Sequence, residues 1–254
     1  MISVLAQNWR NCGIHPGDII LVHSSLKRSL QMYKTTPQAV MESFLEAVGL
    51  NGTVLFPLFN FDFTKGVPFD IRTTPSQMGA LTEAARMHPD ALRSGHPIYS
   101  FAIIGSEARN FAVDNFSGYG SDSPFAILRQ LDGKIAVLDL DDLNSMTFYH
   151  HIEEVHEVPY RWHKRFTGEY TDANGVTSER TYGLFVRDLD RGVLTDVNPM
   201  SEILWEKGLY RGEHPKQGIG LRTISARVMY DAVSEVIGTG HALGLLYSIK
   251  QTTN

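Results

Sequence analysis

The sequence predicts an α/β protein, a layered α/β/α sandwich around a largely parallel, mixed central sheet, with a small β subdomain. Short apolar runs at residues 19–22, 53–57 and 135–140 are bounded by Gly, Pro or Asp, which is typical of buried strands. Amphipathic segments of helical spacing lie between them, as in strand–helix–strand units with parallel strands. Alternation on both sides of an Asn174-Gly175 pair, over residues 166–185, indicates a β-hairpin.

Composition limits the class of protein. At 254 residues and 43% hydrophobic, the chain can bury a full core. The net charge of −5 argues against a nucleic-acid partner and is compatible with a cationic substrate. The single cysteine, Cys12, excludes an intrachain disulfide and a cysteine-rich zinc site. Because there is no apolar run of membrane length and no basic leader, we expect a cytoplasmic protein without a membrane partner.

The first half of the chain predicts strands that end in polar residues. A helix over residues 2–12 precedes the strand at 19–22, and His23-Ser24-Ser25-Leu26 follows that strand directly. Helix 37–48 leads to the strand at 53–57, and residues 60–79 form a long loop of the kind that is usually functional. Within it, Thr74-Pro75-Ser76 is expected to cap a helix that runs to about Met87, and a strand follows at residues 100–104.

The second half predicts the remaining layers. Asp122-Ser123-Pro124-Phe125 is an N-cap pattern whose free N–H groups could bind an anion. Asn144 and Ser145 are expected to cap a helix from Met146. Short helices are expected at residues 200–207 and 224–237, and the glycine-rich loop 208–222 is expected over the active site. We therefore divide the chain into an α/β core (1–159), a β-hairpin subdomain with a loop insertion (160–222) and a closing helix of the core (223–254).

One helical face combines an imidazole with carboxylates. From Met146 the apolar residues recur at helical spacing, which places His150 in one sector with Glu153, Glu154 and Glu157. Neighbouring carboxylates raise the basicity of an imidazole toward that of a general base. A polar face that is only solvated has the same pattern, so periodicity leaves both interpretations open.

Other polar residues allow two interpretations in the same way. Ser24 and Ser25 could offer hydroxyls and backbone N–H groups to an oxyanion, or could simply form a turn. His96 precedes Pro97, which favours an extended backbone and a fixed side-chain direction, and it could equally be a structural histidine.

Several ordered motifs resemble those of the aminoglycoside 3-N-acetyltransferase family over roughly residues 15–235. They are Val22 to Leu26, Asp70 to Gly79 (DIRTTPSQMG), Arg93 to Pro97 (RSGHP) and Asp122 to Phe125 (DSPF). The family's catalytic segment aligns without gaps on Ser145, Thr147, His150 and Glu153, and so selects His150 rather than His151. Asn144, Met146, Phe148 and Ala126 depart from the family pattern, mainly where the acceptor binds.

The resemblance implies a cytoplasmic enzyme, monomeric or homodimeric, that transfers an acyl group from acetyl-CoA to a small-molecule amine without a metal, with antibiotic resistance as a family role. His150 would be the general base, held by Glu153, and Ser24 or Ser25 would receive the oxyanion. The implied coenzyme A contacts are His23, Ser24, Ser25, Leu26, Arg72, Asp122, Ser123 and Phe125. The implied acceptor contacts are Asp62, His96, Thr147 and Glu154.

Three alternatives remain beside acetylation of an aminoglycoside or amino sugar. The acceptor could be an amino-sugar nucleotide or another small biosynthetic amine, or the chain could bind acyl-CoA without turnover. A metal-dependent hydrolase is the weakest alternative, because His150 and His151 are adjacent and no HExxH spacing occurs.

Overall fold

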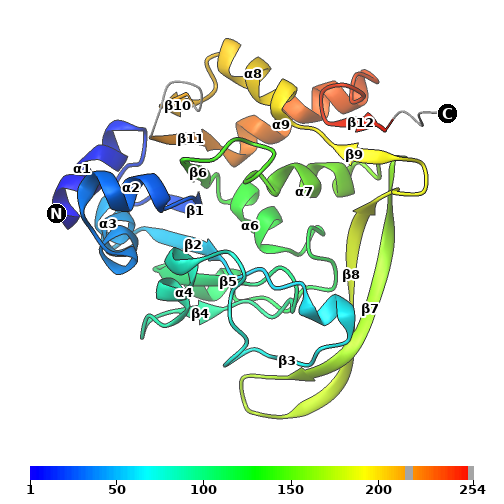
Figure 1. Cartoon of the computed structure of the whole chain (residues 1–254), viewed down its shortest axis with the longest axis horizontal. Coiled ribbons are helices and arrows are strands. Elements are labelled where there is room, and N and C mark those ends of the chain that lie inside the picture. The colour runs from blue at the N-terminus through cyan, green and yellow to red at the C-terminus, as the bar shows by residue number, and fades with distance from the viewer. Residues whose placement is uncertain (215–219, 251–254) are drawn as a thin grey trace.

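The computed structural model describes residues 1–214 and 220–250. Its main sheet has the strand order β10-β11-β6-β1-β2-β5-β4 among these residues (Figure 1). The central strands β6, β1 and β2 are parallel, while β11 pairs antiparallel with β6, and β5 pairs antiparallel with β2. The predicted mixed sheet with parallel central strands is confirmed.

The strands of the main sheet are β1 (Ile19–Ser24), β2 (Thr53–Pro57), β4 (Leu92–Arg93), β5 (Phe101–Gly105), β6 (Lys134–Leu138), β10 (Arg211–Gly212) and β11 (Leu221–Ser225). A second sheet, in the order β3-β7-β8, comprises β3 (Phe69–Asp70), β7 (Arg161–Thr171) and β8 (Thr177–Arg187). β9 (Val193–Thr195) pairs with β12 (Tyr247–Ile249).

The helices are α1 (Ile2–Asn11), α2 (Lys27–Tyr33), α3 (Pro37–Val48), α4 (Ala80–Arg86), α5 (Ala108–Phe111), α6 (Pro124–Gln130), α7 (Phe148–Val155), α8 (Asn198–Glu206) and α9 (Ala226–Gly238), with a 3-10 turn η1 (Asp62–Lys65). In Figure 1, α1 and α3 lie on one side of the main sheet, and α6, α7 and α9 lie on the other.

Two apolar cores cover the two faces of this sheet, because successive strand residues point to opposite sides. Ile20 and Val22 of β1 pack with α1 and α3, where Trp9 stacks on Phe44 at 5.0 Å between ring centroids. Leu21, between them in sequence, packs in the other core with α6, α7 and α9. The α/β/α layering therefore follows directly from the continuous apolar runs of the central strands.

The order of the central strands creates a crevice at the carboxyl ends of β1 and β6. The chain passes from β1 through α3 to β2 on one side, and β6 later takes the place on the other side of β1. In open α/β sheets ligands bind at the carboxyl ends of two adjacent strands whose connections run to opposite sides, because the strand order reverses there. The end of β1 with the residues that follow it, from His23, and the residues after β6, from Leu140, meet at this edge.

Three local predictions were wrong. The helix after Thr74-Pro75-Ser76 begins only at Ala80, because residues 74–79 form a loop that bonds to other elements. Helix α7 begins at Phe148 rather than Met146, and Ser145 donates its hydroxyl to the Asp141 carbonyl instead of capping the helix. The hairpin is five residues longer than predicted at its start, because residues 161–165 pair through their backbone without apolar alternation.

The chain is more continuous than the predicted division. The boundary at residue 222 lies inside β11, which pairs with β6 of the main sheet, and α8 packs on α9. Of the loop 208–222, residues 215–219 lie outside the described residues. No helix in the described ranges is long and apolar enough to cross a membrane.

Buried neutral histidines predict a loss of stability in acid. Burial lowers the pKa of His23 to about 3 and that of His96 and His151 to about 4. Below about pH 6.5 the unfolded chain binds protons that the folded chain does not, so the free energy of unfolding should fall as the pH falls toward 4. Each histidine adds a slope of up to about 1.4 kcal/mol per pH unit.

Urea unfolding measured from pH 7 to pH 5 tests this. In a His151→Gln variant the amide can still donate to the Tyr119 carbonyl, which His151 Nδ1 contacts at 2.7 Å, but it cannot titrate. The variant should have a shallower pH dependence whatever its absolute stability. Identical slopes in the two proteins would contradict the assignment.

Candidate active site

Glu153 joins the histidine that the helical periodicity selected to an arginine of the hairpin. His150 Nδ1 lies 2.8 Å from Glu153 Oε2, and Arg161 Nε lies 2.7 Å from the same oxygen. Glu153 is fully buried, and the side chain of His150 keeps about 20% of its surface exposed. One carboxylate on α7 therefore fixes both a partly exposed imidazole and the first residue of β7.

The electrostatics of this group differ from the expectation that carboxylates make the imidazole more basic. Burial and the Arg161 guanidinium lower the pKa of His150, and its hydrogen bond to Glu153 only partly opposes them. The pKa of Glu153 is also lowered, because Arg161 and His150 outweigh its burial. The pair at neutral pH is consequently a neutral imidazole beside an ionised carboxylate.

This pairing determines which imidazole nitrogen can react. Since Nδ1 donates its hydrogen to the ionised carboxylate, Nε2 carries the free lone pair. The ring of Tyr119 packs against that of His150 at 5.3 Å in a T-shaped arrangement. The arrangement can accept a proton at Nε2 while Glu153 stabilises the resulting imidazolium.

Three adjoining cavities surround His150. The hairpin cavity, of about 580 Å³, lies against β7 and β8, and the loop cavity lies between the residues after β1 and residues 77–82. Between them, the junction cavity shares Tyr99 and His150 with the hairpin cavity and His23 and Met78 with the loop cavity. His150 therefore stands between two larger binding spaces, and Thr147 lines the junction cavity beside it.

The loop cavity is lined by uncharged polar groups. His23 and Ser24, the last two residues of β1, line it together with Ser25 and Leu26. The Ser25 N–H already donates to the Leu138 carbonyl, so it is not available to a ligand. Among the described residues neither serine hydroxyl has a partner, and the buried His23 Nε2 has none either. These groups can bond an uncharged polar ligand.

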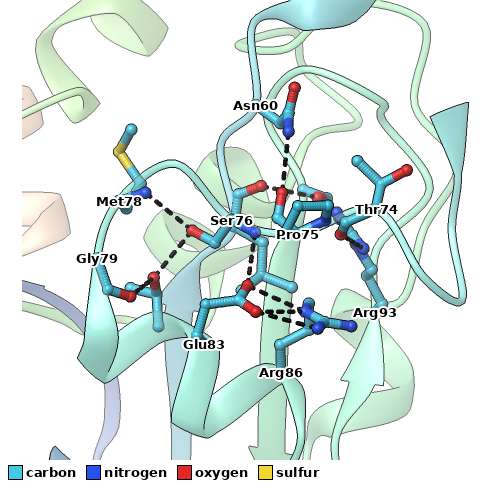
Figure 2. Close-up of polar contacts among 12 residues, drawn as sticks. Asn60, Thr74, Pro75, Ser76, Met78, Gly79, Glu83, Arg86 and Arg93 are labelled. Carbon is cyan, nitrogen blue, oxygen red and sulfur yellow. Dashed lines mark hydrogen bonds and ion pairs between the residues drawn. The ribbon is translucent and has the colours of Figure 1, made fainter. Parts of the chain in front are cut away.

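The loop that forms the opposite wall is held by a network of hydrogen bonds (Figure 2). Asn60 donates to the Pro75 carbonyl at 2.9 Å, and Arg93 donates to the Thr74 carbonyl at 2.6 Å. The Ser76 N–H donates to Glu83, which also pairs with Arg86. The loop is therefore preformed, and its Gln77, Met78 and Gly79 line the loop cavity.

A buried carboxylate also anchors the segment between β6 and α7. Asp142 pairs with the buried Arg222 of β11 at 2.8 Å and accepts the hydroxyls of Tyr149 and Tyr210. Asp142 itself is 1% exposed. Because this network holds residues 140–147, it sets the start of α7 and thereby the position of His150.

Some residues assigned to cofactor binding lie away from these cavities. Arg72 is exposed and pairs with Asp70 at 2.7 Å. Ser123 caps α6 and is fully buried, as is Phe125, while Asp122 is exposed outside the three cavities. The predicted helix start exists, but it does not face the space around His150.

Most residues assigned to the acceptor also lie elsewhere. His96 is fully buried, accepts the N–H groups of Ile98 and Tyr99 at Nδ1, and lies 3.2 Å from the Gly183 carbonyl through Nε2. Glu154 accepts from Ser117, and Asp62 pairs with Lys65 near the solvent. Of this set, Thr147 alone lines one of the three cavities described above.

Sequence reasoning missed several residues around His150. Arg161, Tyr99, Tyr119 and Arg187 all line the hairpin cavity. Arg161 and Arg187 belong to strands of the hairpin, while Tyr99 and Tyr119 lie in loops, and no local pattern relates them to α7. The run of charged residues at 161–165 was the available signal, because such residues on a hairpin seldom pack inward unless they face a polar site.

Among the described residues, no group of three or more His, Cys, Asp or Glu is placed to hold a metal ion.

A family model described as aminoglycoside 3-N-acetyltransferase matches residues 21–237. Aminoglycoside N(3)-acetyltransferase VIII of Streptomyces fradiae is 28% identical over 215 residues, which are 74% of this chain and 72% of that enzyme. Aminoglycoside N(3)-acetyltransferase IV of a Salmonella species is 30% identical over 154 residues, 59% of this chain and 57% of that enzyme.

Solved structures share the fold. The aminoglycoside acetyltransferase AAC(3)-IIb aligns with a TM-score of 0.81 at 19% identity, covering 94% of this chain and 97% of that one. A complex of AAC-IIIb with CoASH aligns with a TM-score of 0.80 at 23% identity, covering 94% and 96%. At these identities the likeness concerns the arrangement of the layers.

Replacing Glu153 with Gln tests the electrostatics around His150. Without the carboxylate, Arg161 acts on the imidazole unopposed, so the pKa of His150 should fall further. The buried arginine also loses its counter-charge, and stability should fall by about 3–5 kcal/mol. The readouts are a titration of His150 followed by NMR and urea unfolding.

The double variant Glu153→Gln/Arg161→Met is the control, because it removes both charges. It should recover part of the stability and move the His150 pKa back upward. An unchanged His150 titration in folded Glu153→Gln would show that the carboxylate does not act on this imidazole.

Proposed function

Because this chain belongs to the aminoglycoside 3-N-acetyltransferase family, we propose that it transfers an acetyl group from acetyl-CoA to an amino group of an aminoglycoside or amino-sugar acceptor. The observation that supports this most is the position of His150, which lies between two cavities with Nδ1 held by Glu153. Direct transfer between two bound substrates needs one base at the boundary of their sites.

Acetyl-CoA fits the loop cavity chemically. The pantetheine arm of coenzyme A is an uncharged chain with two amides, and the described lining of this cavity has hydroxyl, amide and apolar side chains without a charge. His23, with a buried Nε2 that has no partner, is one group that would hold it. When bound, acetyl-CoA supplies an acetyl thioester that an amine can attack.

His150 supplies the base. An amine is mostly protonated at neutral pH and must lose a proton to become a nucleophile, so a base is required. The lowered pKa of His150 keeps its imidazole unprotonated at neutral pH, and the free lone pair is at Nε2. Glu153 then stabilises the imidazolium, as the aspartate does in serine–histidine–aspartate triads.

The hydroxyls of Ser24, the last residue of β1, and of Ser25 would stabilise the oxyanion. Ser24 and Ser25 line the loop cavity and have no protein partner for their hydroxyls among the described residues. They would donate to the carbonyl oxygen as negative charge develops there. The backbone N–H of Ser25 is excluded from this role because it belongs to the sheet.

Two alternatives keep the same fold and site. The acceptor could be an amino-sugar nucleotide or another small biosynthetic amine, and a non-catalytic relative would bind acyl-CoA without releasing thiol. A thiol-release assay with a panel of amines distinguishes these cases, because a non-catalytic relative releases no thiol with any amine.

Removing the base should abolish most of the transfer. General-base catalysis contributes about 10²- to 10⁴-fold, so His150→Ala should lower kcat within that range while acetyl-CoA still binds. Steady-state thiol release and calorimetric binding of acetyl-CoA measure the two effects.

His151→Ala is the matched control, since His151 is adjacent and fully buried against the Tyr119 carbonyl. It should lose stability and keep most of its turnover per folded molecule. A large rate loss in folded His151→Ala with near wild-type rates in His150→Ala would reject the assignment of the base.

The preformed wall of the loop cavity predicts a separate effect on acetyl-CoA binding. In Glu83→Ala the Ser76 N–H loses its charged acceptor, an interaction worth about 1.5–3 kcal/mol. The loop should loosen and the KM for acetyl-CoA should rise about tenfold, with a smaller change in kcat.

Arg86→Ala is the control, because it removes the other partner of Glu83 and leaves the carboxylate free to hold Ser76. Its KM for acetyl-CoA should stay close to the wild-type value. If both variants have the wild-type KM, the loop does not shape the donor site.

A further inference from the structure

The hairpin cavity has an unusual charge for this protein. Among the described residues its lining includes the cations Arg161, Lys164 and Arg187 and the single anion Asp190. The chain as a whole has a net charge of −5. The loop cavity, on the other side of His150, has no charged residue in its described lining. The cationic groups are therefore concentrated on the side of the base opposite to the donor.

Two of these cations have no ion-pair partner among the described residues. Arg161 is paired with Glu153 at 2.7 Å, so its charge is largely balanced. In the described part of the chain, no carboxylate lies within ion-pair distance of Arg187 or Lys164, although the Lys164 ammonium lies 5.4 Å from the centre of the Phe166 ring. Lys164 is three residues from Arg161 along β7 and so leaves the sheet on the opposite face, which makes Arg187 the positive charge that is available beside Arg161.

The register of the hairpin places two arginines, Arg161 and Arg187, side by side. Arg161 of β7 is directly opposite Arg187 of β8, so the two side chains leave the sheet on the same face. Like charges directly opposite each other destabilise a pair of strands. Arg187 also acts on the imidazole of His150 electrostatically. Glu153 balances Arg161, and an anion beside Arg187 would balance the second charge.

The other residues that line the hairpin cavity suit a ligand that contains a ring. Phe61, Tyr99 and Tyr119 also line the hairpin cavity, and Trp162, 49% exposed, lines it from β7. Aromatic faces pack against the apolar faces of sugars and of other rings. A polycationic ligand would meet Arg187 without compensation, which costs binding energy.

We propose that the acceptor is an amine whose molecule also bears an anionic oxygen group, a phosphate or a carboxylate, that binds Arg187 while the amine faces His150. This deepens the proposed acetyl transfer and rests on it. It distinguishes the chain from the relatives named for aminoglycosides, which bear several ammonium groups and no anion.

The test uses acceptor amines that differ in the charge they bear besides the reacting amine. Glucosamine is the reference, glucosamine 6-phosphate adds a phosphate, muramic acid adds a carboxylate, and sisomicin represents polycationic acceptors. Wild-type kcat/KM should be at least tenfold higher for one or both anionic amines than for glucosamine and for sisomicin. The phosphate and carboxylate arms identify which anion the cavity prefers, and added salt should reduce the preference.

Arg187→Glu should lower the ratio of kcat/KM between the preferred anionic amine and glucosamine by at least tenfold, which one ion pair can account for. Arg165→Glu is the matched control, because Arg165 is exposed on the same hairpin, outside the hairpin cavity. It should leave the ratio unchanged.

A preference for sisomicin or glucosamine over both anionic amines overturns the inference and leaves acetyl transfer intact. A raised KM for acetyl-CoA in Arg187→Glu with an unchanged acceptor ratio also overturns it, because the cations would then serve the donor phosphates. If no amine is acetylated, calorimetry with coenzyme A present decides. Binding of an anionic amine that Arg187→Glu abolishes rejects the proposed function alone, and absence of such binding rejects both.

Discussion

The site depends on one buried carboxylate that must be compensated. Glu153 is fully buried on α7, and a buried charge is tolerated only when it is paired and hydrogen-bonded. It finds both partners at a single oxygen, in His150 on its own helix and Arg161 at the start of β7. The same requirement therefore fixes the tautomer of the imidazole and holds the hairpin against the α/β core through Arg161.

The two kinds of partner that Glu153 has explain which part of the site could be predicted from the sequence. His150 and Glu153 are three residues apart on a helix, and helical geometry alone makes them neighbours. Arg161 and Arg187 reach the same place from strands, through a register that no local pattern encodes. The direction of the His150 pKa shift was misjudged for a related reason, since burial and Arg161 dominate it and both are properties of the assembled fold.

The fold likewise contains elements that local sequence predicts and elements that tertiary contacts determine. Central strands were predictable because their apolar runs are buried on both faces, and the Asn174-Gly175 turn because it needs a left-handed glycine, here with φ of +82°. The Thr74-Pro75-Ser76 sequence looks locally like a helix start. There, hydrogen bonds from Asn60 and Arg93 and to Glu83 hold an irregular loop instead, and tertiary contacts override the local signal.

In the proposed reaction, the charges around His150 connect its protonation state with the choice of acceptor. A cavity lined by carboxylates would attract a polycationic amine, and the same carboxylates would raise the pKa of an imidazole at its edge. Here burial lowers that pKa first, and Arg161 and Arg187 lower it further, so the imidazole remains neutral and able to accept a proton at neutral pH. An acceptor that brings its own anion would offset part of the cationic field as it binds. The base would then gain proton affinity when its substrate is in place, which couples binding of the acceptor to activation of its amine.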